Sequence, residues 1–570
     1  MDEDTGSATS EVPPKLLDLG QERIRTLHYT WIAFFMTFYV WFNMAPLATT
    51  MLDSVGWLTT EHIKILLIAN VALTIPARII IGALIDRYGA RIVFSGLMVA
   101  MAVPTVVFTL ADSFLQMLLA RLVLSSVGAG FVIGIKMVAQ WFPPKYIGRA
   151  EGFYAGWGNF GSAFAAMTLP WFAITIMGDW LGLGDDAWRW AMALNGVVMG
   201  AYGVLYYFLV RDVPEGEVLH KSNRTEPMMV SSYGDLLQYI VWSFPLIGAL
   251  GVLAWRVGGV KIDGDPVLSS RVLWTVYGLL AVAYLWHVVK VLQVNLPYLK
   301  AGVPEDEKYH WGSVAALNST YFANFGAELA VVSMLPSFFE NTFVPLTGSS
   351  GQQIVTATVA GVVAASFAFV NLVARPLGGY LSDLMSSRKK TMLVYMIGIV
   401  VGFFFMAFIG KWGSGVDADG LRTVVPTFGG IGWLVVAVAI TVFASVFVQG
   451  AEGATFAVIP MINPRMTGQI AGMAGAYGNV GAVIYLVIFS LVDSRTFFFI
   501  MAGGALASFV VVLFMLEEPE GSFEGGGLTP TIRNTRERIR PTTRAAVCGR
   551  RAEASPRSAG SLPRRRNQNG

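Results

Sequence analysis

Apolar segments of about 20 residues or more recur along the whole sequence, and they limit what the chain can fold into. A segment of this length crosses a hydrocarbon layer of roughly 30 Å as a helix. Residues 31–52, 63–85 and 496–516 are three examples. Only 14% of the 570 residues are charged, against roughly 25% in ordinary soluble domains. We therefore predict an all-α membrane protein.

The apolar segments form two sets of six, with one further pair between the sets. The first set lies near residues 28–52, 63–85, 90–111, 114–141, 148–176 and 187–210. The second lies near residues 313–340, 353–381, 391–410, 431–459, 468–492 and 495–516. The pair at 236–255 and 271–296 is either two extra transmembrane helices or two helices lying at the interface. The predicted domains are an N-terminal segment (1–27), a six-helix bundle (28–211), a linker with the extra pair (212–312), a second six-helix bundle (313–516) and a disordered basic tail (517–570).

The charges of the short loops predict the orientation of the chain. DRYGAR, PPKYIGR, SDLMSSRKK and NPRMTGQ fall on one side of the predicted spans, whereas the acidic ADSF, MGDWLGLGDDAW and GVDADG fall on the other. Basic loops stay in the cytoplasm. We therefore expect both termini to be cytoplasmic and the protein to lie in the cytoplasmic (inner) membrane. The loop RVGGVKIDGDPVLSSR of the extra pair does not fit, because it carries three basic residues on the outer side.

The sequence carries few of the groups that enzymes and metalloproteins use. Its single cysteine, Cys548, lies in the polar tail, and its five histidines have no metal-ligand spacing. We find neither a phosphate-binding loop nor a nucleophile beside a base. We therefore expect no enzymatic activity, no cofactor, no metal and no nucleic-acid partner.

The two sets of spans share an internal repeat. The residues that match in the second span of each set are Arg78, Gly82 and Asp86 with Arg375, Gly379 and Asp383. In the fifth spans, GRAEGFYAGWGNFG (148–161) aligns without a gap with GQIAGMAGAYGNVG (468–481). Repeated halves are typical of transporters whose substrate site lies at the repeat interface near the midplane of the bilayer.

With these motifs, the chain resembles the nitrate/nitrite porter family of the major facilitator superfamily. The paired arginines and the two GNxG stretches carry the resemblance, together with FANFGAELA (322–330) and QGAEGATFAVIP (449–460). It covers about residues 28–220 and 313–516. It implies the major facilitator fold, and it places Phe131, Tyr321 and Phe325 around the transported anion. This chain departs from the family in having Trp157 and Tyr477 within the glycine stretches.

The two arginines are the strongest candidates for anion binding. Each lies eight residues from its loop aspartate, or roughly 12 Å along a helix, close to mid-bilayer. Arg78 and Arg375 could each pair with a buried carboxylate. The alternative, which we favour, is that both face a shared central cavity where nothing of the chain's own neutralises them. A planar oxyanion such as nitrate or nitrite would then bind through parallel hydrogen bonds.

Other residues are assigned to substrate contact, packing or coupling. Asn159 and Asn479 place amides in apolar spans and are expected to contact the anion. The small residues of the two stretches allow close helix packing in lipid, and they include Gly156, Gly158, Gly161, Gly475, Gly478 and Gly481. The candidates for coupling are Glu328, Glu452 and Lys136. The two glutamates could instead form a structural bond to a neighbouring helix or to an arginine, and Lys136 could extend to the nearby interface.

We therefore expect a secondary active transporter that carries nitrate, nitrite or both by alternating access. Importing an anion into a cell that is negative inside needs a driving force, and we favour nitrate/proton symport. Nitrate/nitrite antiport, symport of a small carboxylate with protons, and an anion sensor are the alternatives. The expected partners are nitrate, nitrite, protons and the lipid bilayer, with the protein acting as a monomer.

Overall fold

A computed structural model describes residues 16–142, 144–216, 227–262, 265–385, 387–416, 422–463 and 466–517. Most of the predicted tail (517–570) and much of the predicted N-terminal segment (1–27) lie outside the described residues. The predicted boundaries between the two six-helix bundles stay a prediction.

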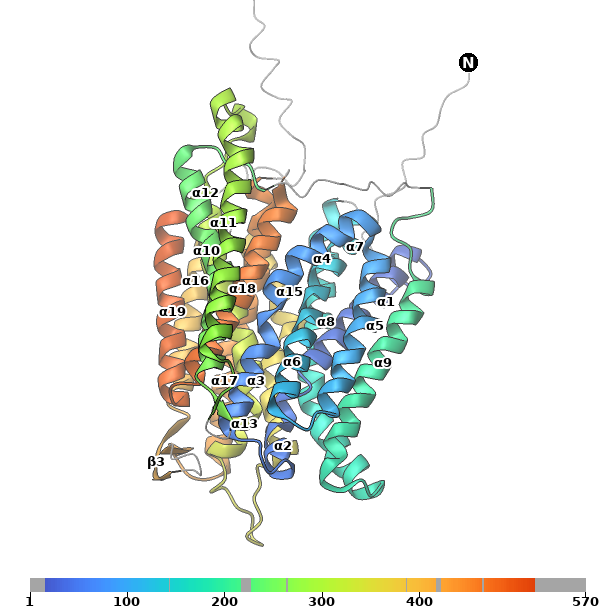
Figure 1. The fold of residues 1–570 in the computed structure, drawn as a ribbon, viewed down its shortest axis with the longest axis vertical. Coiled ribbons are helices and arrows are strands. Elements are labelled where there is room, and N and C mark those ends of the chain that lie inside the picture. Colours follow the sequence, from blue (N-terminus) through green and yellow to red (C-terminus); the bar gives the residue numbers. More distant parts are fainter. Residues whose placement is uncertain are drawn as a thin grey trace, which may run out of the picture. The chain divides into compact units, whose positions relative to one another are not determined.

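Long helices dominate the described chain. Fourteen helical segments within it are long and apolar enough to cross a membrane, which confirms the predicted all-α membrane fold. Both segments of the extra pair, Tyr233–Gly258 and Ser270–Ala301, are among the fourteen. Figure 1 shows these two helices, α10 and α11, running alongside the helices of the bundle.

Within the described residues, the N-terminal half contains nine α-helices and four short helical segments. The α-helices are α1 (Glu22–Trp41), α2 (Ala48–Ser54), α3 (Thr60–Ala72), α4 (Thr74–Tyr88), α5 (Ala90–Thr109), α6 (Phe114–Leu124), α7 (Gly130–Trp141), α8 (Pro144–Trp171) and α9 (Ala187–Leu209). The short segments are η1 (Ala45–Leu47), η2 (Ser125–Ala129), the π-helical η3 (Phe172–Trp180) and η4 (Gly184–Asp186).

The insert and the C-terminal half follow. The insert contains α10 (Tyr233–Gly258), β1 (Lys261–Ile262), β2 (Asp265–Pro266), α11 (Ser270–Ala301) and η5 (Glu305–Glu307). The C-terminal half contains α12 (Trp311–Ala323), α13 (Phe325–Thr342), α14 (Ala357–Phe369), α15 (Asn371–Leu384), α16 (Arg388–Met406), β3 (Gly410–Val416), β4 (Arg422–Pro426), α17 (Ile431–Ile462), α18 (Thr467–Phe489) and α19 (Ser494–Met515).

The second span of each half is interrupted one turn before its arginine. Helix α3 ends at Ala72 and α4 begins at Thr74, so Arg78 lies in the second turn of α4. Helices α14 and α15 are likewise divided at Val370, ahead of Arg375. The Ser125 hydroxyl accepts the backbone N–H of Leu73 in the first interruption at 3.0 Å. Interrupted spans are common where transporters bind substrate near the midplane.

The two halves pack against each other through the segments that carry the sequence repeat. Helix α8 of the N-terminal half packs on α14 and α15, and α18 of the C-terminal half packs on α3 and α4. The fifth span of each half thus contacts the second span of the other. The approach is close: a Cβ at Gly361 of α14 would lie 2.2 Å from the backbone oxygen of Ala166 in α8. This exchange of contacts brings Arg78 and Arg375 to a common interface.

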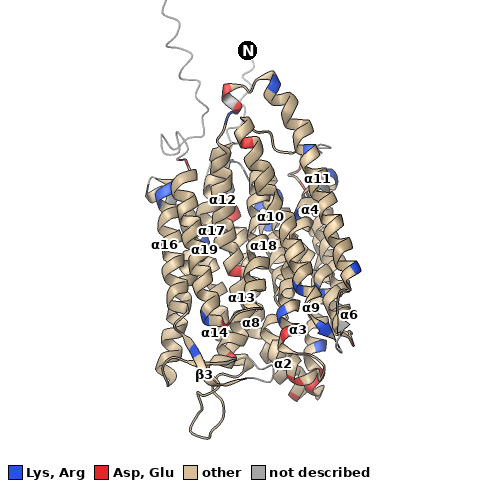
Figure 2. Cartoon of the chain, turned by 60° about the vertical axis from the view of Figure 1, so that its left-hand side comes forward, with Lys and Arg blue, Asp and Glu red and all other residues tan. Residues whose placement is uncertain are grey.

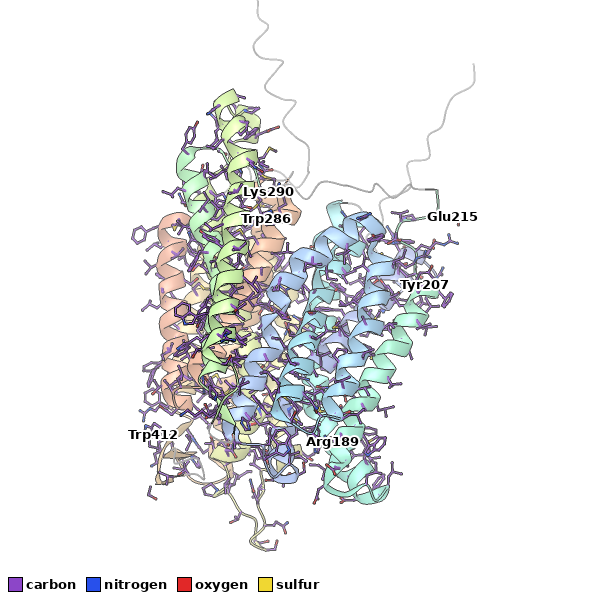
Figure 3. All side chains as sticks on the ribbon, viewed as in Figure 1. Arg189, Tyr207, Glu215, Trp286, Lys290 and Trp412 are labelled. Carbon is purple, nitrogen blue, oxygen red and sulfur yellow. The ribbon has the colours of Figure 1, made fainter. Side chains whose placement is uncertain are left out.

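One end of the bundle is marked by α2 and the antiparallel hairpin β3–β4, and we call it the hairpin end (Figure 1). In the hairpin Gly410 pairs with Pro426. Figure 2 shows that most of the helical ribbon carries neither acidic nor basic residues. Figure 3 places Arg189 and Trp412 at the hairpin end, and Glu215 at the opposite end. Charged and amphipathic side chains at both ends suit a membrane-spanning bundle.

Candidate functional site

Arg78 and Arg375 lie against the same two aromatic rings. The Cζ atom of Arg78 is 5.5 Å from the ring centroid of Phe131 and 5.4 Å from that of Phe325. The corresponding distances for Arg375 are 5.7 and 5.8 Å. The rings come from α7 and α13, so both halves contribute one cation and one aromatic face. Cation–π contacts of this kind attract a guanidinium and hold it in place.

Arg78 is a buried cation, and the polar contact described for it is a carbonyl. It is 3% exposed, and its Nη1 donates to the backbone oxygen of Gly475 at 2.5 Å. Among the described residues, its Nε and Nη2 atoms have no hydrogen-bond partner. Two unsatisfied buried donors on a permanent charge are costly. These donors are therefore available to an anion.

Arg375 is neutralised by the chain itself, which corrects one expectation. Its Nη2 lies 2.9 Å from a carboxylate oxygen of Glu452 and also donates to the Tyr321 hydroxyl at 2.9 Å. The prediction that neither arginine has a counterion was therefore wrong for Arg375. The reason is that α15 and α17 pack closely, so that a Cβ at Gly453 would lie 2.0 Å from the backbone oxygen of Arg375.

A second carboxyl group joins this ion pair. Glu328 of α13 interacts electrostatically with both Arg375 and Glu452. The Asn371 side-chain amide donates to Glu328. Both glutamates are buried, at 1% and 0% exposed. The two coupling candidates are therefore adjacent, and they share one arginine.

The two asparagines differ in how their amides are satisfied. Asn479 donates to the backbone oxygen of Gly475 at 3.1 Å, which is the oxygen that Arg78 also contacts. Asn159 is fully buried, and neither its oxygen nor its nitrogen has a hydrogen-bond partner within the described part of the chain. Both polar atoms of the Asn159 amide are therefore available for a further hydrogen bond.

The predicted glycines lie at close helix contacts. A Cβ at Gly475 would lie 2.8 Å from Nη1 of Arg78, and one at Gly478 would lie 2.5 Å from the Phe325 ring. Similar crowding, at 1.8 to 3.0 Å, would arise at Gly156, Gly158, Gly161 and Gly481. A side chain at Gly475 or Gly478 would displace the arginine or the ring, so these two glycines shape the site directly.

Trp157 and Tyr477, the two residues that depart from the family pattern, make contacts with residues other than the arginines. Trp157 is 37% exposed and packs on Trp31, with ring centroids 5.3 Å apart. The Tyr477 hydroxyl donates to the backbone oxygen of Trp242 in the insert. Lys136, the third coupling candidate, is exposed on α7, whereas both arginines are buried.

Sequence reasoning missed two residues of the site. Asn371, which bonds Glu328, lies four residues before Arg375 on the same helix face, and that spacing could have identified it. Phe456 packs edge-on against Phe131 and Tyr321, at centroid distances of 5.7 and 5.2 Å. Its spacing from Glu452 is also four residues, but aromatic residues are too common in these spans for spacing to single it out.

A groove of about 790 Å³ lies elsewhere, between the insert and the C-terminal half. Its walls include Phe244, Trp255 and Leu280 of the insert, with Phe322 and Val480 of the C-terminal half. None of the residues that line it is charged. The groove therefore does not suit an inorganic anion.

Comparisons with known proteins identify the family of the chain. The sequence model of the Major Facilitator Superfamily matches residues 30–337. The chain is 44% identical to a nitrate/nitrite transporter of Nostoc punctiforme, with 88% of this chain and 94% of that protein covered. It is 41% identical, with the same shares covered, to a nitrate/nitrite transporter of a Picosynechococcus species.

More distant relatives extend the comparison. A high-affinity nitrate transporter of Arabidopsis thaliana is 26% identical over 83% of this chain and 75% of that protein. Among solved structures, the xylose transporter XylE from E. coli in a partially occluded inward-open conformation matches with a TM-score of 0.53. The identity is 14%, and 88% of this chain and 99% of that chain are covered, so this match supports the fold alone. The chain belongs to the nitrate/nitrite porter family of the major facilitator superfamily.

Proposed function

We propose that this protein carries nitrate and nitrite across the cytoplasmic membrane by alternating access, and that one proton accompanies each anion. The observation that supports this most directly is the charge count of the buried cluster. Arg78 and Arg375 contribute two positive charges, and Glu328 and Glu452 contribute two negative charges when both are ionised. The empty cluster is then neutral.

The anion is proposed to bind at Arg78. The two free donors of its guanidinium form a planar fork that matches the geometry of a planar oxyanion. Phe131 and Phe325 would cover the flat faces of the anion, and the amides of Asn159 and Asn479 would bind at its edge. The names of the curated relatives supply nitrate and nitrite as the substrates.

Charge balance supplies the reason for a proton. An anion bound beside Arg78 gives the neutral cluster one negative charge, which is costly in a buried site. A proton shared between Glu328 and Glu452 restores neutrality and still leaves one carboxylate to pair with Arg375. The loaded site is then electrically neutral, so its movement does not work against the membrane potential. An unaccompanied anion would meet about 2.3 kcal/mol per 100 mV.

The closed geometry supports alternating access. Arg78 and Arg375 are 3% and 4% exposed, so an anion reaches them only when the halves separate at one end. The repeat contacts of α8 and α18 are the surfaces that would rock against each other. All four charged groups come from one chain, and we therefore propose a monomer as the transport unit. By the positive-inside rule, we propose that the hairpin end lies outside and that both termini are cytoplasmic.

Liposomes that contain the purified protein test the coupling. With an acidic exterior and no internal anion, labelled nitrate should accumulate inside, and a proton ionophore should abolish the accumulation. Internal nitrite without a pH gradient should not drive comparable uptake. If internal nitrite does drive it, the protein is a nitrate/nitrite antiporter and the proton role of the two glutamates is wrong. Formate and acetate serve as competitors, because a carboxylate transporter would bind them.

A further inference from the structure

The end of helix α10 carries a buried arginine that contacts both halves of the transporter. Arg256 Nη1 lies 3.0 Å from a carboxylate oxygen of Glu61, in the first turn of α3. Its Nε donates to the Ser490 hydroxyl at 2.8 Å, directly after α18. The Arg256 side chain is only 9% exposed. These bonds explain why the insert loop keeps a basic residue on the side where the positive-inside rule disfavours it.

Helix α10 is attached mainly to the C-terminal half. Near its start, Asp235 accepts the backbone N–H of Trp311 at 3.2 Å, and Tyr239 packs on Trp311 with ring centroids 5.7 Å apart. Further along, the Trp242 backbone oxygen accepts the hydroxyl of Tyr477. Helix α10 therefore moves with α12 and α18 when the halves rock. The bond from Arg256 to Glu61 then crosses between two bodies that separate.

A second contact lies at the same place. The Nζ atom of Lys64, one turn after Glu61 on α3, is 5.7 Å from the ring centroid of Phe489 at the end of α18. The contact between α3 and α18 lies beside the arginine site. Helix α4, which follows α3, carries Arg78, and Arg78 donates to the Gly475 backbone oxygen of α18.

The ion pair between Arg256 and Glu61 has the strength that a reversible contact requires. Arg256 is largely enclosed, but the Glu61 side chain is 51% exposed. An ion pair with one partner in water contributes little net stability and is readily broken. The serine hydroxyl remains as a partner for Arg256 after Glu61 leaves.

We infer that Arg256 is a positioning residue for transport. Arg256 moves with the C-terminal half, holds α3 against α18 while the hairpin end is closed, and releases Glu61 when that end opens. The insert then acts as a reversible clamp on the transport cycle. This role needs only that the chain carries an anion, whichever ion drives it.

Cross-linking tests the inference in a Cys548→Ser background, which removes the native thiol. In Glu61→Cys/Arg256→Cys protein, a short bifunctional methanethiosulfonate reagent should lower nitrate uptake at least tenfold, and a reductant should restore it. The matched control is Arg256→Cys/Ser490→Cys, in which cross-linking joins two parts of one body and should change uptake less than twofold. Uptake before cross-linking reports separately whether each variant transports.

Charge reversal gives a second test that does not depend on cross-linking. Arg256→Glu should lower uptake at least fivefold, because it places like charges together, and adding Glu61→Arg should restore at least half of the loss. Unchanged uptake in the cross-linked 61/256 pair would overturn the inference, since the contact would not open during transport. Equal block of both cross-linked pairs, or no rescue by the double reversal, would overturn it as well.

Discussion

Glu452→Gln removes the carboxylate that pairs with Arg375 while keeping the size of the side chain. Glu452 is fully buried, and its carboxylate oxygen lies 2.9 Å from Nη2 of Arg375. Removing one partner of a buried pair costs about 3 to 5 kcal/mol, because an uncompensated charge is left behind. Glu328 also interacts electrostatically with Arg375 and can recover part of this cost. We therefore expect a loss of stability of about 2 to 4 kcal/mol without substrate.

The variant should also change how the protein responds to nitrate. Its cluster carries one extra positive charge, so nitrate alone neutralises it without a proton. We expect nitrate to raise the melting temperature of Glu452→Gln more than that of the parent protein, because a ligand that binds only the folded state stabilises it. Nitrate exchange between the two sides should continue, whereas uptake driven by a pH gradient should be lost.

Thermal unfolding in detergent with and without nitrate, and uptake at several external pH values, are the two assays. Glu340→Gln is the matched control, because Glu340 lies at the far end of α13, bonded to Thr49, and should keep the parent's pH dependence. If Glu452→Gln accumulates nitrate with the same pH dependence as the parent protein, the proposed proton site is refuted. If nitrate raises the melting temperature of Glu452→Gln no more than that of the parent protein, the charge count is refuted.

Three further predictions concern other parts of the chain. Arg78→Lys should lower nitrate uptake at least tenfold, because a point ammonium loses at least one charge-assisted hydrogen bond worth about 1.5 to 3 kcal/mol; near-normal uptake would exclude Arg78 as the binding residue. Gly478→Val should destabilise the protein by about 1 to 3 kcal/mol, because its Cβ would lie 2.5 Å from Phe325. A Cβ at Gly432 would meet nothing within 4 Å, and Gly432→Val should unfold as the parent does. Deleting residues 530–570 should leave uptake intact in the liposome assay, and a loss of transport would favour a signalling or regulatory tail.

The interpretation of the insert shows where sequence reasoning reached its limit. Hydropathy and length predicted two apolar helices at 236–255 and 271–296, either spanning or lying at the interface, but could not say what they contact. The basic loop between them counted against spanning, because it carries three basic residues on the predicted outer side. The structure gives Arg256 a buried position between Glu61 and Ser490, and such partners from distant spans cannot be identified from local sequence.

The sequence by itself determined the membrane fold, the repeat and the identity of most candidate site residues. Each of these depends on local properties, namely the apolar length that lipid demands and the matching spacing of Arg78 and Arg375 in equivalent spans. Only the tertiary structure decided that Arg375 has a counterion in Glu452, whereas the described polar contacts of Arg78 include only a backbone carbonyl. The physical reason is that the relative rotation and separation of packed helices decide which buried charges meet. That packing is set by small residues, such as Gly453 and Gly475, acting across elements far apart in the chain.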